Sequence, residues 1–586
     1  MLSKSQFEVL YCLKDGASVS QRSLSDQTGF SLGKINRTVR ELKDLGYLSS
    51  DTRISENGMK ELNVYKVDNA IILAAGKSSR FIPISYEHPK GLTVVRGEVL
   101  IERQIRQLQQ AGIPEVVVVI GHMQEKFYYL EQKFGVILVT NNDFKTKNTH
   151  SSIYAAREYL HSSYICCSDN YYPRNLFRSH EYHSMYCTQF QDGYSRTERG
   201  VITNTNGLII STQKPSEHIW TIQGHAYMNH DFSRRFLEIL DSYYGVPGTD
   251  ALYWEEIYAE NLNELPLYER KCLSTDFYEF DTAEDLRRFD PDFLLSNNTH
   301  VVDHICNTLD VQANEINDIT ALNAGLTNQS FRFSCKGIQY VYREPGKGTS
   351  AYIDRKREMI ALETARDLGI DESYLRGDPE EGWKISYYVE VSEPFDFQNT
   401  QHLKMLCSHL KKLHDSRARC GSTFDYLSQA NLLLQKISSS NESAVQDMSD
   451  IAKEIEKIHA SILADDWPTQ LAHNDIFESN LLVAQDKLYL IDWEFAGDTD
   501  IGYDICKLFT TTDTPKEALD EKLFCYYNRQ PTEDEKRHLV GCAAICYYLW
   551  FVWAIYQNQL GYNYHDLETK WYKRMRMYIN MYYKFN

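Results

Sequence analysis

A strand that ends in small residues and is followed by basic ones constrains the fold of this chain more than any other feature. Residues 67–76 read VDNAIILAAG, an apolar run whose last three residues are small: Ala74, Ala75 and Gly76. Small residues at a strand end let the backbone approach a phosphate closely, with its amides directed at the anion. Arg80 and Lys90 follow in GKSSRFIPISYEHPKGL and supply charge that offsets a triphosphate. The sequence therefore predicts a phosphate-binding turn.

The chain has 586 residues, too many for one hydrophobic core, and its pattern separates into three predicted domains. Residues 1–64 alternate short helical periods with turns, residues 67–290 alternate strands and helices, and residues 302–586 are rich first in strands and then in helices. In the second segment, residues 116–120 read VVVVI, which is typical of a strand buried on both faces of a parallel sheet. The expected fold class is multidomain, α/β and α+β.

Two carboxylates of the second segment are candidates for binding Mg²⁺. Asp169 follows the apolar run YICC, so it emerges at the carboxyl end of a strand, where α/β sheets bind ligands. Asp281 lies in EFDTAED. Both can bridge Mg²⁺ to the α-phosphate of a nucleotide, where the metal stabilises charge as pyrophosphate leaves.

Residues 67–290 resemble the nucleoside-triphosphate transferases and, more closely, the bacterial CTP:phosphocholine cytidylyltransferases. The matching stretches are LIERQIRQLQQAGIPEVVVVIGH, NNDFKTKNTHSSIYAAREYL, CSDNYY, LYWEEIY and FYEFDTAEDL. The resemblance implies a Rossmann-like sheet, CTP as a substrate, and catalytic Mg²⁺ held by Asp169 and Asp281 with help from Glu279.

Aromatic residues are the candidates for binding a trimethylammonium group, which aromatic faces and an acid would hold. Tyr253 and Trp254, followed by Glu255 and Glu256, are the first choice, and the weaker candidates are Tyr194 and Tyr227. Packing in the core is an equally good interpretation of these rings. Where phosphocholine-specific relatives place a Trp, residues 197–200 read TERG, which leaves a less methylated amino-alcohol phosphate or a phosphonate as alternative substrates.

The third segment carries a second catalytic pattern, LAHNDIFESNLLVAQDKLYLIDWEF. His473, Asn474 and Asp475 are followed five residues after the Asp by Asn480, and then by Asp492 at the end of an apolar run. This is the spacing of a kinase catalytic loop and its metal-binding Asp. Asp475 can accept the proton of a substrate hydroxyl, while Asn480 and Asp492 can coordinate Mg²⁺ on ATP.

This segment resembles the choline and ethanolamine kinases and, more distantly, the aminoglycoside phosphotransferases, which implies a bilobal fold. LNAGLTNQSFRF is similar to their phosphate-covering loop, and three of its residues are placed nearest the nucleotide: Gly325, Thr327 and Asn328. Arg343 stands where protein kinases carry a lysine, with Glu358 as its expected partner. Glu494, in D-W-E, is assigned to substrate binding.

Choline kinases read their substrate with a W-x-x-W arrangement on a late helix. Here Trp550 and Trp553 are three residues apart, on one helix face, and can form an aromatic cage for a quaternary ammonium. Taken without the kinase pattern, both side chains are also consistent with core packing. The surrounding run at 542–556 is shorter than the roughly 20 residues that span a bilayer, so we expect a buried helix and no membrane span.

In residues 31–48, SLGKINRTVRELKDLGYL, apolar residues recur at helical spacing: Leu32, Ile35, Val39, Leu42 and Leu45. Lys34, Arg37 and Arg40 lie on the polar face, and Ser31 is the predicted N-cap. The segment resembles the winged-helix domains of bacterial transcription regulators. Its second helix contacts DNA in one interpretation, and in the other the domain is a regulatory or dimerising appendage. The net charge of −19 disfavours nucleic-acid binding by the chain as a whole.

The N-terminal residues are too polar for a signal peptide, so we expect a cytoplasmic protein whose 13 cysteines are reduced. The two patterns together predict an enzyme that phosphorylates choline with ATP and then transfers CMP from CTP to phosphocholine, giving CDP-choline and pyrophosphate. Three alternatives stay open. They are the same chemistry on ethanolamine or another amino-alcohol, a sugar-phosphate nucleotidyltransferase joined to another small-molecule kinase, and a ligand-sensing transcription regulator.

Overall fold

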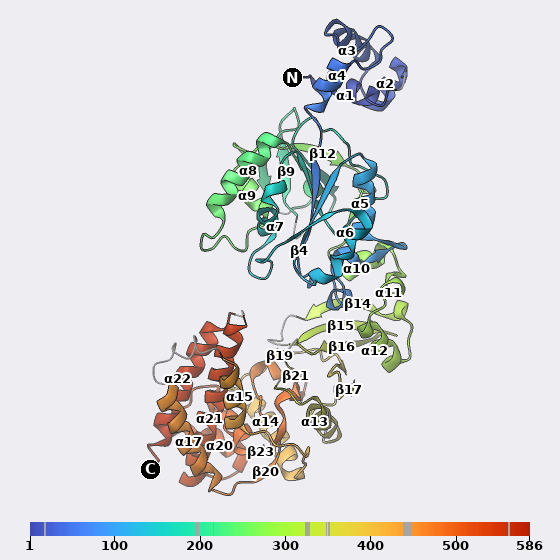
Figure 1. The fold of residues 1–586 in the computed structure, drawn as a ribbon. Coiled ribbons are helices and arrows are strands. Elements are labelled where there is room, and N and C mark those ends of the chain that lie inside the picture. The colour runs from blue at the N-terminus through green and yellow to red at the C-terminus, as the bar shows by residue number, and fades with distance from the viewer. Residues whose placement is uncertain are drawn as a thin grey trace. The chain divides into compact units, whose positions relative to one another are not determined.

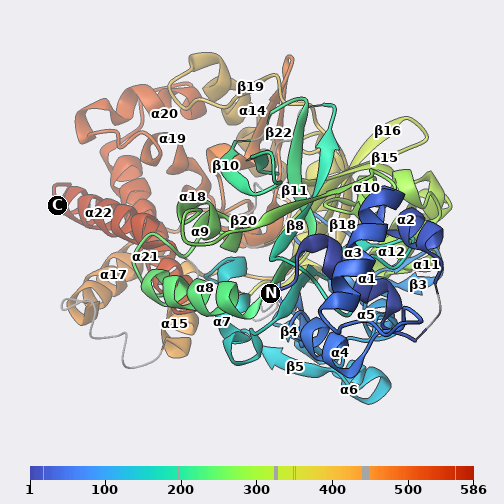
Figure 2. The same cartoon turned by 90° about the horizontal axis from the view of Figure 1, so that it is seen from above.

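The structure is a computed structural model that describes every residue except 17–18, 194–197, 215, 323–327, 347–348, 350–351, 438–447, 561–562 and 586. The chain forms two compact units, residues 1–314 and 315–586. Each is described by itself below (Figure 1, Figure 2). The division falls inside the segment that was predicted to begin at residue 302. Helix α12 (His300–Leu309) belongs to the first unit, where the His300 N–H donates to Glu87 Oε1 at 2.8 Å.

The first unit begins with four helices: α1 (Lys4–Leu13), α2 (Gln21–Thr28), α3 (Leu32–Asp44) and α4 (Glu56–Asn63). Ser31 caps α3 as predicted, since its Oγ accepts a hydrogen bond from the Lys34 N–H. On the predicted apolar face Ile35, Val39 and Leu42 are buried, but Leu32 and Leu45 are 47 % and 53 % exposed. These two residues lie at the ends of the helix, beyond the reach of the small core.

A nine-stranded sheet follows, and its central path runs in the order β10-β9-β11-β6-β1-β4-β5, with β8 beside β11 and β12 beside β8. Its strands are β1 (Asn69–Ala74), β4 (Glu115–Ile120), β5 (Ile137–Thr140), β6 (Ser163–Cys167), β8 (Met185–Gln191), β9 (Gly200–Thr203), β10 (Ile209–Gln213), β11 (Ile219–Met228) and β12 (Tyr268–Cys272). The predicted parallel pairing holds for β1 with β4 and β6, and for β4 with β5. Because β11 runs antiparallel to β6, the sheet as a whole is mixed.

Helices cover both faces of this sheet, because alternate residues of the central strand β1 enter two different cores. Ile71 and Leu73 pack with α7 (Thr149–Ala155), α8 (His230–Tyr243) and α9 (Trp254–Glu260). Ala70 and Ile72 pack with α5 (Leu100–Gln110) and α6 (Tyr129–Phe134). Shorter elements complete the unit: β2 (Val94–Val95), β3 (Glu98–Val99), β7 (Asn170–Tyr171), β13 (Tyr278–Glu279), α10 (Ala283–Phe289) and α11 (Phe293–Ser296). The result is a three-layer α/β domain with a fully buried central strand.

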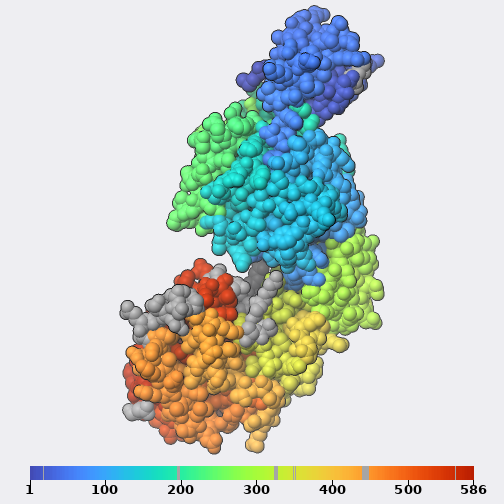
Figure 3. All heavy atoms as spheres, viewed as in Figure 1, coloured from blue at the N-terminus to red at the C-terminus, as the bar shows by residue number. Residues whose placement is uncertain are grey.

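The N-terminal helices pack against residues 178–183 of the sheet domain. The Arg178 guanidinium forms two hydrogen bonds to the Glu8 carboxylate, at 3.1 and 2.8 Å, and lies 4.0 Å from the Tyr11 ring centroid. Tyr182 packs on Phe7 and donates a hydrogen bond to the Leu2 carbonyl at 2.8 Å. In Figure 3 the N-terminal helices are the blue atoms at the top, next to the cyan and green atoms of the sheet domain.

The second unit starts with a five-stranded antiparallel sheet in the order β14-β15-β16-β18-β17. Its strands are β14 (Asn317–Leu322), β15 (Gln329–Cys335), β16 (Ile338–Glu344), β17 (Tyr374–Gly377) and β18 (Lys384–Tyr387), with helix α13 (Arg355–Asp367) following β16. Two further pairings, among β19 (Glu393–Pro394), β21 (Leu481–Ala484) and β22 (Lys487–Leu490), and between β20 (Thr469–Ala472) and β23 (Gly497–Asp500), carry the predicted catalytic loop.

The remainder of this unit is helical, as the sequence predicted. Its helices are α14 (Thr400–Ser416), α15 (Tyr426–Lys436), α17 (Met448–Leu463), α18 (Gly502–Ile505), α19 (Lys507–Thr510), α20 (Leu519–Tyr527), α21 (Glu533–Gln559) and α22 (His565–Tyr582). Helix α21 is long and apolar enough to cross a membrane, but 94 % of its most apolar stretch is buried inside the unit. It is the core helix that the sequence predicted.

We expect Arg178→Ala to loosen the N-terminal helices from the sheet domain, because Glu8 loses its partner in a partly buried contact. The cost should be about 1–3 kcal/mol. Trypsin should then cleave near the exposed Lys66 faster than in the unaltered protein. Arg37→Ala, which removes an exposed side chain of α3, is the control, and equal cleavage rates for both variants would contradict the docking.

Candidate active sites

The first site is a cavity of about 590 Å³ at the carboxyl ends of β1 and β6. The turn after β1 lines it with all the residues predicted there: Ala74, Ala75, Gly76, Arg80 and Lys90. Asp169, which follows β6, and Asp281, which follows β13, complete one wall. The structure therefore brings together the small turn, the two cations and the two carboxylates that the sequence singled out.

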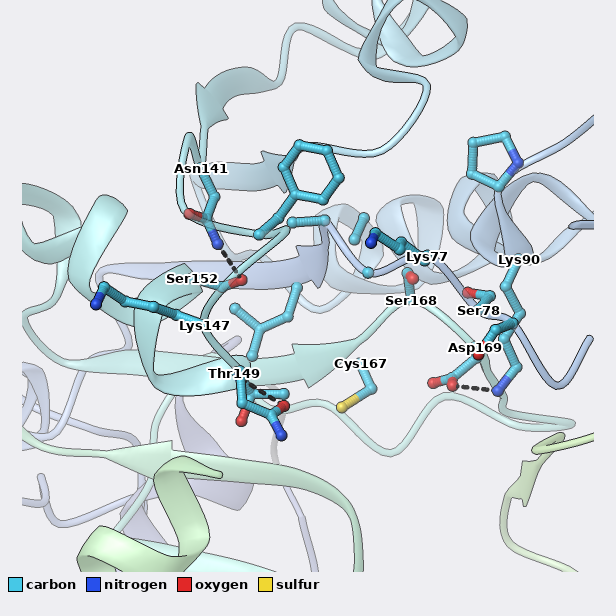
Figure 4. A pocket seen from close by; sticks show the side chains of 18 of the residues that line it. Lys77, Ser78, Lys90, Asn141, Lys147, Thr149, Ser152, Cys167, Ser168 and Asp169 are labelled. Carbon is cyan, nitrogen blue, oxygen red and sulfur yellow. Dashed lines mark hydrogen bonds and ion pairs between the residues drawn. The ribbon is translucent and has the colours of Figure 1, made fainter. Parts of the chain in front are cut away.

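The charged groups of this cavity form one network. Lys90 Nζ lies 2.7 Å from Asp169 Oδ2, as Figure 4 shows, and 3.9 Å from Asp281 Oδ1. Arg80 Nη2 lies 3.1 Å from the same Asp281 oxygen. Burial lowers the pKa of Lys90, but the carboxylates of Asp169, Asp281 and Glu279 together outweigh this effect, and the pKa lies above its ordinary value. Lys90 is therefore charged at neutral pH.

The three predicted metal-binding carboxylates fit a divalent cation. Asp169 Oδ1 is buried and accepts no hydrogen bond from a described residue. Burial raises the pKa of Glu279 well above its ordinary value, and the carboxylates of Asp169 and Asp281 raise it further. Oxygen ligands of this kind are those that Mg²⁺ prefers, and a bound cation would relieve the repulsion between them.

The opposite wall of the cavity was not predicted from the sequence. Residues 144–149 and Ser152 line it, and Figure 4 shows Lys147 and Thr149 on that wall. Lys147 pairs with Asp250, and Asn141 Nδ2 donates to Ser152 Oγ at 3.1 Å. The stretch NNDFKTKNTHSS, which carries the family resemblance, was the available signal for these residues.

The predicted substrate-binding aromatics separate into two groups. Tyr253 lines the cavity and is 49 % exposed. Trp254 is buried and stacks on Tyr186 with 5.3 Å between ring centroids, so it belongs to the core. Tyr227 is buried on β11 opposite Tyr164, away from the end of β6 that forms the site. The structure places neither in the cavity, and Tyr194 lies outside the described residues.

Glu255 follows Tyr253 and Trp254 in the chain and is the acid expected to lie near a bound ammonium group. It accepts a hydrogen bond from the Tyr186 hydroxyl at 3.0 Å, and its other oxygen is buried without a donor among the described residues. Burial raises the pKa of Glu255 to about 7. A nearby cation would stabilise the ionised form of this buried carboxyl group.

The second site lies on the loop after β20. Asn480 Nδ2 donates to Asp475 Oδ2 at 3.0 Å, which fixes the carboxylate of the predicted base. Asp492 has a left-handed backbone, with φ 66°, and its Oδ1 is buried without a hydrogen-bond donor among the described residues. Asp492 thus offers an oxygen atom that accepts no hydrogen bond from a described residue, which fits Mg²⁺. The oxygen of Asn480, the other predicted ligand, accepts a hydrogen bond from the Ser479 hydroxyl at 3.3 Å.

Asp504 anchors this loop and was not predicted. Its two carboxylate oxygens accept the N–H groups of His473 and Asn474, both at 2.8 Å. The N–H of Asp475 in turn donates to His473 Nδ1 at 3.1 Å. Asn474 has φ 69°, in the left-handed region that Asn adopts more readily than most residues, and the anchor fixes this turn of the loop.

Arg343 lies among acids at the sheet end of the site. Its Nη1 is 2.7 Å from Glu358 Oε1, which is the predicted pair, and 3.5 Å from Glu494 Oε2. Lys384, which was not predicted, lies 3.5 Å from Glu358 and 3.6 Å from Asp492. Burial and then Asp492 raise the pKa of Glu494 to about 7.

The phosphate-covering loop is described only in part. Gly325 and Thr327 lie outside the described residues. Asn328 Nδ2 donates to Glu494 Oε2 at 2.8 Å, which joins the end of this loop to the acid cluster. Because Arg343 and Asn328 both contact Glu494, this side chain is held in place by protein groups.

Trp550 and Trp553 are buried neighbours on α21. Their ring centroids are 6.1 Å apart at 74°, and Trp571 of α22 lies 5.9 and 6.0 Å from them. Phe495, which follows Asp492 in the chain, also packs on Trp550, at 5.2 Å. Trp550 and Trp553 therefore lie next to the segment that carries Asp492. The indole of Trp571, which was not predicted, lies beside them.

Comparisons with known proteins follow the same division. Residues 2–49 match the family model for winged helix-turn-helix DNA-binding domains. Residues 70–169 match that for MobA-like NTP transferase domains, and residues 319–541 that for choline/ethanolamine kinases.

Among curated proteins, the choline-phosphate cytidylyltransferase of Haemophilus influenzae is 30 % identical over 219 residues, which are 37 % of this chain and 94 % of that protein. The chain belongs to the choline-phosphate cytidylyltransferase family. The enzyme of the same name from Streptococcus pneumoniae is 29 % identical, over 38 % of this chain and 96 % of its own length. The structure of choline kinase LicA from Streptococcus pneumoniae is 22 % identical, with a TM-score of 0.43, over 48 % of this chain and all of that one.

The chain is therefore an enzyme with a cytidylyltransferase-family domain and a choline/ethanolamine kinase domain, in the predicted order after a winged helix. ATP and CTP are the nucleotide substrates of such domains.

We expect Asp504→Ala to lower the kinase kcat about 10- to 100-fold, because the amides of the catalytic loop lose their acceptor. Nucleotidyl transfer should be unaffected. ADP release and pyrophosphate release, measured separately, check this. Asp450→Ala, at an exposed position of α17, is the control, and an unchanged kinase rate in Asp504→Ala would show that the loop does not need its anchor.

Proposed function

We propose that the chain makes CDP-choline from choline in two steps, with Mg²⁺ at both sites. The C-terminal domain phosphorylates choline with ATP, and the N-terminal sheet domain joins the phosphocholine to CTP. One observation supports both steps. Asp169 in the first site and Asp492 in the second each have a buried carboxylate oxygen that accepts no hydrogen bond from a described residue, although a lysine lies close to each side chain. Both relatives named above act on choline phosphate by their names.

In the kinase step, Asp475 accepts the proton of the choline hydroxyl. The hydroxyl oxygen attacks the γ-phosphorus of ATP, and ADP leaves. Asn480 fixes the Asp475 carboxylate, and Asn480 and Asp492 would hold Mg²⁺ on the ATP phosphates. Arg343 and Lys384 supply positive charge at the sheet end of the site. Trp550 and Trp553 offer ring faces to the trimethylammonium group.

In the transferase step, a phosphate oxygen of phosphocholine attacks the α-phosphorus of CTP, and pyrophosphate leaves. Asp169, Glu279 and Asp281 would hold Mg²⁺, which stabilises the charge that develops on the phosphates. Lys90 and Arg80 position the triphosphate. Tyr253, with Glu255 behind it, is the best-placed candidate for the ammonium group, and a primary ammonium or a phosphonate is the alternative substrate chemistry.

We propose a cytoplasmic location, because the chain uses ATP and CTP and all 13 cysteines are free thiols.

Phosphorus NMR of the full chain with Mg²⁺, ATP, CTP and choline should show phosphocholine as a transient and CDP-choline as the product. Asp475→Ala should abolish phosphorylation but keep CMP transfer to added phosphocholine. Lys90→Ala should do the reverse, with at least about a 10²-fold loss of transfer. If the unaltered enzyme turned over only sugar phosphates, or nothing at all, the proposal would be wrong.

DNA contact by α3 is a second candidate function for residues 1–64. Arg37 and Arg40 are exposed on α3, and the contacts to residues 178–183 come from elsewhere in the N-terminal domain, so this face stays open in the first unit. Arg40→Ala should weaken duplex DNA binding in a mobility-shift assay about uniformly across sequences. No binding at low salt by the unaltered chain would favour the regulatory alternative.

A further inference from the structure

Lys507, the first residue of α19, has a fully buried side chain in the kinase unit. Its Nζ has no hydrogen-bond partner among the described residues. Aromatic rings surround it instead: the Nζ lies 4.1 Å from the ring centroid of Phe477, 5.6 Å from that of Tyr547 and 6.0 Å from that of Trp550. A buried amine in such a position is unusual, because an ammonium loses its hydration there.

Asp475 favours the charged form of Lys507, whereas the Cys546 and Cys506 thiols and the Tyr547 phenol have raised pKa values themselves and are uncharged at neutral pH. Burial lowers the pKa of Lys507, but Cys546, Tyr547, Cys506 and Asp475 outweigh this effect, and the pKa lies above its ordinary value. Asp475, the proposed base, is the carboxylate among these groups. The ammonium therefore lies between the catalytic segment and the indoles of α21.

Lys507 lies over Trp550, which is one of the two rings that the proposed function assigns to substrate. Phe477 and Trp550 are edge-to-face neighbours, with 5.8 Å between their centroids. A quaternary ammonium has no N–H, so its binding depends on ring faces and on the absence of competing charge. A primary ammonium has three N–H donors and can bind through carboxylates and carbonyls instead.

The geometry points to Lys507 as a specificity-determining residue of the kinase: its ammonium occupies ring faces at Phe477 and Trp550 and weakens the binding of quaternary ammonium substrates more than that of primary ones. This inference rests on the proposed function, since it concerns the amine site of the same domain. Choline remains a substrate. The ratio of kcat/KM for choline to kcat/KM for ethanolamine is smaller than it would be if the indoles of Trp550, Trp553 and Trp571 bound the amine without a nearby ammonium.

The test is steady-state kinetics of the full chain with Mg²⁺ and ATP, without CTP, on choline and on ethanolamine. Lys507→Met replaces the ammonium with an apolar group of similar length. It should raise the ratio of kcat/KM for choline to kcat/KM for ethanolamine about tenfold, through a lower choline KM, with the KM for ATP unchanged. Lys507→Arg, which keeps the charge, should leave the ratio near that of the unaltered enzyme.

Two further variants make the result interpretable. Lys453→Met removes an exposed lysine of α17 and should change neither amine. Trp550→Ala should raise the choline KM more than the ATP KM, which shows that the assay reports on the ring faces. If Lys507→Met is unstable, Lys507→Gln gives the same comparison.

An unchanged or lower choline-to-ethanolamine ratio in the Lys507 variants would overturn the inference. A fall in kcat with both amines at constant KM would also overturn it, since Lys507 would then act on phosphoryl transfer. If the unaltered enzyme phosphorylates neither choline nor ethanolamine, the proposed function itself is wrong. That outcome differs from an active enzyme whose choline-to-ethanolamine ratio of kcat/KM does not change in the Lys507 variants.

Discussion

The ion pair between Lys90 and Asp169 is the contact on which the transferase site depends. It joins the turn after β1 to the end of β6, and through Asp281 it reaches the segment after β13. These three segments are far apart in the chain, and each carries a group that is costly to bury alone. One ammonium between two carboxylates offsets that cost, and it leaves one oxygen of Asp169 without a hydrogen-bond donor among the described residues. The electrostatics that hold the site together thus also leave a ligand position for a metal.

In the kinase site, a larger number of charged side chains offsets the cost of burying each charge. Arg343, Arg355 and Lys384 surround Glu358 and Glu494, which are almost fully buried. Burial raises the pKa of Glu358, but Arg343 and its neighbours outweigh this and lower the pKa to about 2. Glu494, which is closer to Asp492, has a raised pKa instead. Two carboxylates in one cluster therefore differ in pKa because their charged neighbours differ.

The two halves of the chain use aromatic residues differently. In the transferase, Trp254 and Tyr227 stabilise the cores on the two faces of the sheet, whereas Tyr253 and Phe144 line the cavity. In the kinase, three indoles lie together beside the catalytic segment, and Lys507 places an internal cation over one of them, Trp550. Aromatic content by itself did not distinguish these uses, because a ring that packs a core and a ring that binds a cation have the same sequence spacing.

The sequence by itself determined the elements whose signals are local. The apolar strand before Ala74, the small-residue turn, the spacing from Asp475 to Asn480 and Asp492, and the Ser31 cap all depend on neighbours in the chain. Tertiary structure decided the features that depend on contacts between distant parts of the chain. It set the antiparallel course of β11, the anchoring of the catalytic loop by Asp504, and the wall formed by Lys147 and Asn141. It also placed Tyr227 at the wrong end of its strand for substrate. A side chain's partner and its burial depend on which distant strand or helix packs against it, and a single sequence does not specify that pairing.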